Sequence, residues 1–185
     1  MAATPAAIHF TGDPEADRLL AANPLALLIG FALDQQVTVQ QAFAGPLKLL
    51  QRLGHLDAAR IGSSGDELEA AFSEKPAVHR FPGAMAKRVR ELCDLVASEY
   101  GGDATRLWNE AGDAKELERR IRALPGFGDM KVIAFGSTLA KRLGVEAAQS
   151  LVPAFRTLGD VDSVEALESY QAEKRARKAA ARAAR

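Results

Sequence analysis

The sequence of 185 residues predicts an all-α fold. β-Branched residues never alternate with polar residues over more than a few positions, so no segment has the period of two that is typical of a strand. Several segments instead carry apolar residues at helical spacing, as Met85, Val89, Leu92 and Val96 do. Proline and glycine separate these segments at the positions where helices commonly begin and end.

The N-terminal half contains several predicted helices, and residues 1–12 have no period and are expected to precede them. Asp13-Pro14 and Asn23-Pro24 each place a capping side chain before a proline, which is a pattern that opens a helix. The helix after Pro24 is apolar on almost every side and is therefore expected to be buried. The predicted segments are 14–22, an apolar run over 25–33, a helix after 37–39 that ends at Gly54, a short turn within 55–65, and 66–72.

The C-terminal half continues the pattern of short helices after a turn-rich loop over 75–83. Gly101-Gly102 ends a helix that begins at Ala84, and Asp113 is placed to cap a later one. Pro125 cannot continue that later helix, which is expected to stop near Ala123. The predicted segments are 84–100, a short helix around 105–110, a helix from 113 to 123, a helix beyond Gly128 and a helix from about Ser163.

The composition is ordinary for a globular protein and excludes several classes. Apolar residues make up 48% and charged residues 26%, so the chain as a whole is not disordered. The single cysteine, Cys93, excludes a disulfide framework, a four-cysteine zinc site and a four-cysteine iron–sulfur cluster. The histidines lack ligand spacing, so no metal site is expected. No apolar run of membrane-spanning length and no signal-peptide pattern occur, and we expect a cytoplasmic protein without a membrane partner.

The charges sum to zero but are unevenly distributed along the chain. Residues 171–185 hold six Lys and Arg against Glu173, a net charge of +5, so the remainder carries −5. This basic, alanine-rich tail either lies along a phosphate backbone or forms a solvated helix that frays. Two more basic clusters occur, at Lys87, Arg88 and Arg90 and at Arg119, Arg120 and Arg122.

The most informative segment is the hairpin Leu124-Pro125-Gly126-Phe127-Gly128, which lies between two helical patterns. Gly126 and Gly128 can adopt backbone angles closed to other residues and so allow a tight reversal. A glycine turn that opens onto a helix directs several unpaired N–H groups the same way, with no side chain between them and a ligand. Such a turn fits a single DNA phosphate, although a plain corner between two helices is the simpler alternative.

This hairpin resembles the helix-hairpin-helix motif of the base-excision DNA glycosylases, the superfamily that includes endonuclease III and the alkyladenine glycosylases. Two further segments are similar to that family: the buried helix that ends in Asp34-Gln35-Gln36, and the Phe81-Pro82-Gly83 turn that leads into a helix bearing Lys87. The resemblance covers about residues 24–145 and implies a two-lobed helical fold without the family's iron–sulfur cluster. It leaves an N-terminal segment (1–23), a C-terminal helical segment (146–170) and the basic tail (171–185) outside this domain.

The resemblance implies a DNA base-excision repair protein that acts on double-stranded DNA as a monomer at the nucleoid. The reaction would be that of a monofunctional glycosylase, which hydrolyses the N-glycosidic bond of a damaged base. No cofactor is implied, apart from a monovalent cation that could bind at the hairpin. Gln36, or its neighbour Gln35, would fill the gap that an extruded nucleotide leaves, with a helix cap or an interlobe hydrogen bond as the alternative. The residues implied to contact DNA are Gln35, Gln36, Gly126, Phe127, Gly128, Lys131, Lys87 and Arg88.

The catalytic carboxylate implied by the family has no direct counterpart here. It would stabilise an oxocarbenium-like sugar, and the family's Asp lies about twenty residues after the last hairpin glycine. That count reaches Ala148, so Asp160 is the candidate if residues are inserted after Gly144, with Asp162 or Glu146 as alternatives. Asp160 and Asp162 would otherwise only cap the helix from about Ser163.

Two further departures concern the start of the helix after the hairpin. Lyase members carry a lysine two residues after the last glycine, where this chain has Met130; Lys131 follows one residue later, turned by about 100° on a helix. Lys131 is therefore a catalytic candidate for lyase chemistry only. Asp129 suits the helix dipole but would repel a phosphate. Two alternatives stay open: a catalytically inactive protein that recognises damaged or distorted duplex, and a helical protein–protein module.

Overall fold

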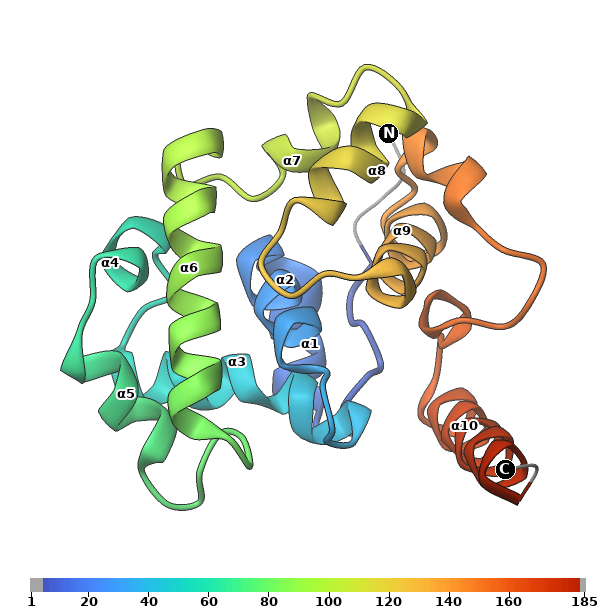
Figure 1. The fold of residues 1–185 in the computed structure, drawn as a ribbon, viewed down its shortest axis with the longest axis horizontal. Coiled ribbons are helices and arrows are strands. Elements are labelled where there is room, and N and C mark those ends of the chain that lie inside the picture. Colours follow the sequence, from blue (N-terminus) through green and yellow to red (C-terminus); the bar gives the residue numbers. More distant parts are fainter. Residues whose placement is uncertain (1–4, 184–185) are drawn as a thin grey trace.

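Helix α2 (Pro24–Leu33) lies at the centre of the fold in a computed structural model that describes residues 5–183 (Figure 1). Every residue from Leu25 to Leu33 is buried, as the apolar sequence predicts. The side chain of Asn23 caps this helix by accepting a hydrogen bond from the N–H of Ala26 at 3.1 Å. The described residues contain helices and no strand, which confirms the all-α prediction.

The first group of helices comes from the N-terminal part of the chain and surrounds α2. It consists of α1 (Pro14–Ala22), α3 (Val39–Leu53), α4 (Ala58–Gly62), α5 (Asp66–Ser73) and α6 (Pro82–Tyr100). Helices α1, α3 and α6 contact α2, while α4 and α5 pack against α6 (Figure 1). Helix α6 begins two residues before its predicted start because proline suits the first position of a helix.

A second group follows α6 and carries the hairpin. It consists of α7 (Arg106–Asn109), α8 (Ala114–Arg122), α9 (Asp129–Arg142) and the 3-10 helices η1 (Glu146–Leu151) and η2 (Leu158–Asp160), both packed on α9. The rings of Phe31 in α2 and Phe135 in α9 lie 5.0 Å apart, so aromatic packing joins this group to the central helix. Trp108 packs edge-on to Phe135 at 6.0 Å and is buried in the core.

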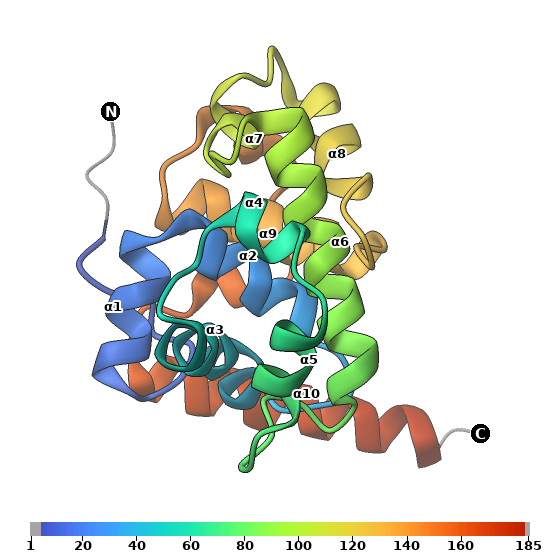
Figure 2. The ribbon, with the colours of Figure 1, turned by 90° about the vertical axis from the view of Figure 1, so that its left-hand side faces the viewer.

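The basic tail is the second half of a single helix, α10 (Val164–Ala183). Leu167, near the start of α10, is buried in the same hydrophobic core as Ile8 near the N-terminus. Figure 2 shows α10 running along the lower edge of the molecule, with its C-terminal end projecting outward. Of the predicted tail, Ala184 and Arg185 lie outside the described residues.

No single described helix is long and apolar enough to cross a membrane. Helices α1 and α2 meet that length and composition only when they are taken together, and the two are bent by 115° at the break between them.

Candidate nucleic-acid interface

The hairpin between α8 and α9 exposes its glycines and buries its aromatic residue. Gly126 has a φ of +78°, which lies in the left-handed region that favours glycine, and both Gly126 and Gly128 are exposed. Phe127 is only 4% exposed, and its ring lies 6.2 Å from that of Phe135. The core therefore fixes the hairpin through Phe127 and leaves the backbone of both glycines accessible.

The start of α9 directs unpaired N–H groups toward solvent. Within residues 5–183, the N–H groups of Gly128, Asp129 and Met130 donate no hydrogen bond to another residue, and no side chain caps this helix. These groups carry the partial positive charge of a helix N-terminus. This arrangement suits an anion such as a DNA phosphate.

Arg88 of α6 connects the hairpin to the turn between α2 and α3. Its Nη1 donates a hydrogen bond to Oε1 of Gln35. Its Nε lies so close to the hairpin that a Cβ added at Gly126 would approach it to 2.7 Å. Three segments that are distant in the sequence therefore meet at one arginine.

These segments line a shallow hollow of about 700 Å³, which we name the hairpin hollow. It is lined by Gln35, Arg88, Arg122, Leu124, Gly126, Phe127, Gly128, Asp129, Met130 and Lys131. The structure thus brings together six of the eight residues expected to contact DNA. Lys87 does not line the hollow; it is exposed on α6, with its Nζ 3.9 Å from the carboxylate of Glu91.

Gln36 occupies a strained position next to the hollow. Its φ is +58°, the only positive φ of a non-glycine residue among the described residues, and its side chain is exposed. Its neighbour Gln35 is fixed through the backbone: the carbonyl oxygen of Gln35 lies 3.1 Å from Nε2 of His79. Because Nδ1 of His79 accepts from the N–H of Phe81, Nε2 carries the proton and donates, and burial lowers the pKa of His79. The turn is held firmly enough to keep Gln36 in an unfavourable conformation.

Asp129 at the start of α9 is paired rather than isolated. Its carboxylate accepts a hydrogen bond from Nη1 of Arg122, and Nη2 of the same arginine donates to Glu118 at 2.8 Å. Arg122 comes from the last turn of α8, so the pair spans the hairpin. The repulsion of phosphate that Asp129 alone would cause is therefore partly offset by this guanidinium.

Lys131 and Asp34 are two partly buried residues whose opposite charges attract each other. Nζ of Lys131 donates to the carbonyl oxygen of Ala32 at 3.1 Å and lies 5.5 Å from the ring centroid of Phe127. Burial lowers the pKa of Lys131 to about 8, and the positive charge of Arg88 lowers it by a smaller amount. The negative charge of Asp34 raises this pKa. Burial also raises the pKa of Asp34, against the attraction of Lys174 and Lys131.

Sequence reasoning does not identify Asp34 as a candidate catalytic or DNA-binding residue. The sequence feature that could have identified Asp34 is its position. It is the first residue of the polar segment Asp34-Gln35-Gln36, which follows the buried helix α2. A carboxylate at that point comes directly after the buried helix and directly before two glutamines.

No protein-family model, curated protein or solved structure matches this chain.

The three carboxylates proposed from the sequence as catalytic do not line the hairpin hollow. Asp160 accepts hydrogen bonds from Lys141 and from the N–H of Thr157, the latter at 2.8 Å. Burial raises the pKa of Asp160, but these hydrogen bonds outweigh it and hold the pKa below its usual range. Asp162 and Glu146 are exposed. Asp160 therefore closes the turn of η2 and links it to α9. It does not act as the cap of the following helix, which was the alternative role.

Tyr170 of α10 is partly buried against the hydrophobic core. Burial raises the pKa of Tyr170, and both Asp34 and Asp160 raise it further.

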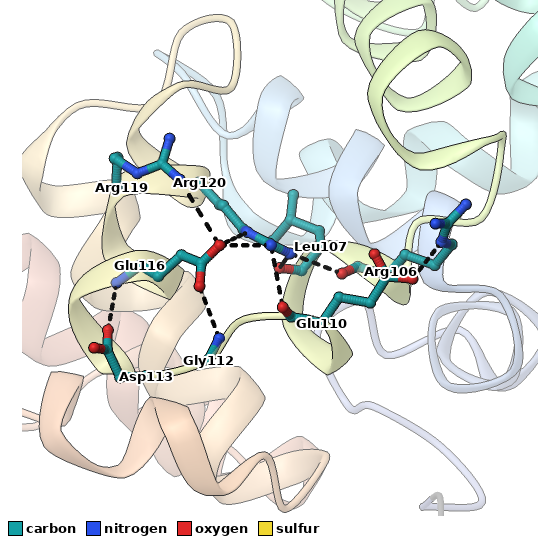
Figure 3. Close-up of polar contacts among 8 residues, drawn as sticks. All are labelled: Arg106, Leu107, Glu110, Gly112, Asp113, Glu116, Arg119 and Arg120. Carbon is teal, nitrogen blue, oxygen red and sulfur yellow. Dashed lines mark hydrogen bonds and ion pairs between the residues drawn. The ribbon is translucent and has the colours of Figure 1, made fainter.

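The helix that leads into the hairpin is held by Arg120 (Figure 3). Its guanidinium donates to the carbonyl oxygens of Arg106, Leu107 and Glu110 at 3.1 to 3.3 Å, and to Glu116 at 2.6 Å. These carbonyls belong to α7 and to its C-cap residue Glu110, so Arg120 joins α8 to α7. Of the basic cluster at 119–122, Arg120 is structural and Arg122 lines the hollow.

Among the described residues, no group of three or more His, Cys, Asp or Glu side chains is placed to hold a metal ion.

Proposed function

We propose that this protein is a DNA base-excision repair protein that binds double-stranded DNA at the hairpin hollow. The observation that carries the proposal is the contact of Arg88 with both Gln35 and Gly126. Through that contact the phosphate-binding N–H groups and the turn bearing Gln36 are neighbours. Such proximity is required if one element holds the backbone while another fills the gap beside an extruded nucleotide.

The reaction we propose is hydrolysis of the N-glycosidic bond by a monofunctional glycosylase. Water would attack C1′ of the deoxyribose as the bond to the base breaks, and the base would leave with the bonding electrons and a proton. An ionised carboxylate lowers the free energy of the oxocarbenium-like transition state. We assign this role to Asp34, because it lines the same groove as Gln36, the residue proposed to fill the gap of the extruded nucleotide. Burial raises the pKa of Asp34, and the smaller attraction of Lys174 and Lys131 favours its ionised form.

A catalytically inactive protein that recognises distorted duplex is the second candidate. One observation favours it: Asp160 is engaged by Lys141 and Thr157 and lies outside the hairpin hollow. In that case Asp34 would serve only to balance the charge of Lys131. Binding of DNA is common to both candidates, and only the chemistry separates them.

The deciding experiment incubates the protein with duplexes that contain uracil, alkylated purines, 8-oxoguanine or mismatches, followed by alkali to cleave abasic sites. We expect cleavage of one substrate, a loss of at least a hundredfold in Asp34→Asn, and near wild-type activity in Asp160→Asn. Loss of activity in Asp160→Asn alone would reassign the carboxylate. Failure to cleave any duplex, with DNA binding retained, would leave the inactive protein as the function. Failure to bind duplex DNA at all would refute both.

A further inference from the structure

The inner face of α10 carries a row of basic side chains. Lys174, Lys178 and Arg182 follow Gln171 at successive intervals of three or four residues, which places these four side chains on one side of the helix, and Arg175 is adjacent to Lys174. All five line a groove of about 760 Å³ that α10 forms with the turn between α2 and α3. We name it the tail groove. On its other wall lie Asp34, Gln36, Val37, Thr38, Val39, Gln41 and Arg80.

The cations of this groove are available for a ligand. None of Lys174, Arg175, Lys178 and Arg182 forms an ion pair or a hydrogen bond within residues 5–183. The guanidinium of Arg80 on the opposite wall lies 4.8 Å from the ring centroid of Phe81 and forms no ion pair or hydrogen bond to another described residue. Asp34 is the one acidic residue among those lining the groove, so the groove as a whole is strongly positive.

The first half of α10 is fixed to the body of the protein, which gives the groove a defined wall. Arg156 donates to the carbonyl oxygen of Ala166 at 3.2 Å, to Ser169 at 3.0 Å and to Glu173 at 2.5 Å. Nε2 of Gln171 donates to Oε1 of Gln40 in α3. The cationic row therefore begins at a point that is held against α3 and continues along the projecting end of the helix (Figure 2).

The tail groove and the hairpin hollow meet at the same turn. Gln35 lines the hollow and Gln36 lines the groove. From Gln171 to Arg182 the row is about 16 Å long, which corresponds to roughly five phosphates of one strand of duplex DNA. A duplex held at the hairpin would extend past Gln36 toward this row.

We infer that the tail groove is a second DNA-binding surface, which holds the phosphate backbone of the duplex beyond Gln36. This inference rests on the proposed function, since it concerns the DNA that the hairpin would bind. The contacts are to phosphate alone, because lysine and arginine side chains on a projecting helix are placed to neutralise a backbone rather than to read base edges. The surface raises affinity without selecting a lesion.

The test measures binding of the full chain to a fluorescein-labelled duplex, with or without a tetrahydrofuran abasic-site analogue, over a range of salt concentrations. We compare Lys174→Gln/Lys178→Gln with Lys115→Gln/Arg177→Gln. The control pair removes the same charge from residues that do not line the groove. We expect the groove variant to bind both duplexes about tenfold more weakly at 0.1 M salt, with a slope of log K against log salt that is smaller by about 2. The control variant keeps the wild-type slope to within about 0.5.

An unchanged slope in the groove variant, with wild-type DNA binding intact, would overturn this inference and leave the proposed function standing. A wild-type protein that binds neither duplex would overturn both. A groove variant that keeps its affinity for DNA but loses binding to phosphatidylserine vesicles would assign the groove to a membrane surface and also overturn the inference. Circular dichroism checks that α10 stays helical in both variants.

Discussion

Arg88 packs directly on Gly126, so that a side chain at this glycine would place its Cβ 2.7 Å from Nε of Arg88. The same arginine bonds to Gln35, and the position of the turn between α2 and α3 therefore depends on the hairpin. We expect Gly126→Ala to lower the free energy of unfolding by about 1 kcal/mol, because of its φ of +78°. We also expect it to weaken duplex binding, because Arg88 must move away from Gln35. Urea unfolding and fluorescence anisotropy measure the two effects.

Gly12→Ala is the matched control for this prediction. Gly12 has a φ of +79°, and nothing lies within 4 Å of a Cβ built there. The backbone penalty is therefore similar, and the contact with Arg88 is absent. Equal losses of DNA affinity in the two variants would show that Arg88 does not couple the hairpin to the turn.

Neutralising Asp129 is expected to strengthen DNA binding. The carboxylate stands at the first position of α9, beside the unpaired N–H groups that we assign to phosphate. Asp129→Asn leaves Arg122 without this partner and free to contact the phosphate, so we expect duplex affinity to rise about three- to tenfold at low salt. Asp66→Asn makes the same change at the first position of α5, away from the hollow, and is expected to have no effect. Equal affinities for wild type and Asp129→Asn would argue against phosphate at this helix start.

The strained backbone of Gln36 predicts opposite changes in stability and function. Gln36→Gly is expected to raise the free energy of unfolding by about 0.5–1 kcal/mol, because glycine accepts a φ of +58° without strain. The same variant removes the amide that would replace an extruded base. We therefore expect a smaller increase in 2-aminopurine fluorescence when it binds a duplex that carries this reporter at the lesion.

Gln36→Asn completes the comparison, since asparagine tolerates the left-handed region and keeps a shorter amide. Its fluorescence signal should lie between those of wild type and Gln36→Gly. An undiminished signal in Gln36→Gly would show that Gln36 does not enter the duplex.

Burial of Lys131 predicts a stability that depends on pH. The pKa of its ammonium is about 8 in the folded protein, against 10.5 for an ordinary lysine. Between these two values the unfolded chain binds the proton and the folded chain does not, so the folded state gains stability as pH rises. We expect the free energy of unfolding of wild type, relative to Lys131→Met, to rise by about 2 kcal/mol between pH 8 and pH 10.5.

The comparison with Lys131→Met is essential, because Cys93 also titrates in the alkaline range. Burial raises the pKa of the Cys93 thiol to about 12, which lowers stability as pH rises above 9.0, in both proteins alike. Chemical denaturation at four or more pH values gives the difference directly. A difference that stays constant with pH would show that the ammonium of Lys131 is solvated in the folded protein.

The helices were largely predictable because their boundaries are encoded locally. Asp13-Pro14 opens α1 and Asn23-Pro24 opens α2, where the sequence places them, and Gly54 ends α3. These signals depend on residues within one turn of each helix end. The same holds for Gly101, which ends α6 in the left-handed conformation.

The position of the carboxylates could not be predicted in the same way. A residue count from Gly128 makes Asp160 a candidate. Its position in the fold, however, is determined by where η2 packs against α9. Gly159 lies so close to Ser137 that a Cβ there would approach its carbonyl oxygen to 2.5 Å. This contact fixes η2 beside Lys141, and it depends on packing between segments that no local spacing encodes. The contacts of α10 cannot be predicted from the sequence either, because charge alone does not show which face of a helix packs against the rest of the protein.

The burial of α2 has a consequence for how this protein tolerates mutation. The turn that bears Gln35 and Gln36 is the direct continuation of the most deeply buried helix, and Lys131 bonds to the carbonyl of Ala32 within that helix. Substitutions at positions such as Leu28 or Phe31, which contact no ligand, would shift the turn together with the helix. Loss-of-function variants are therefore expected to cluster in the interior as much as on the surface, and a genetic screen alone would not outline the proposed DNA-binding face.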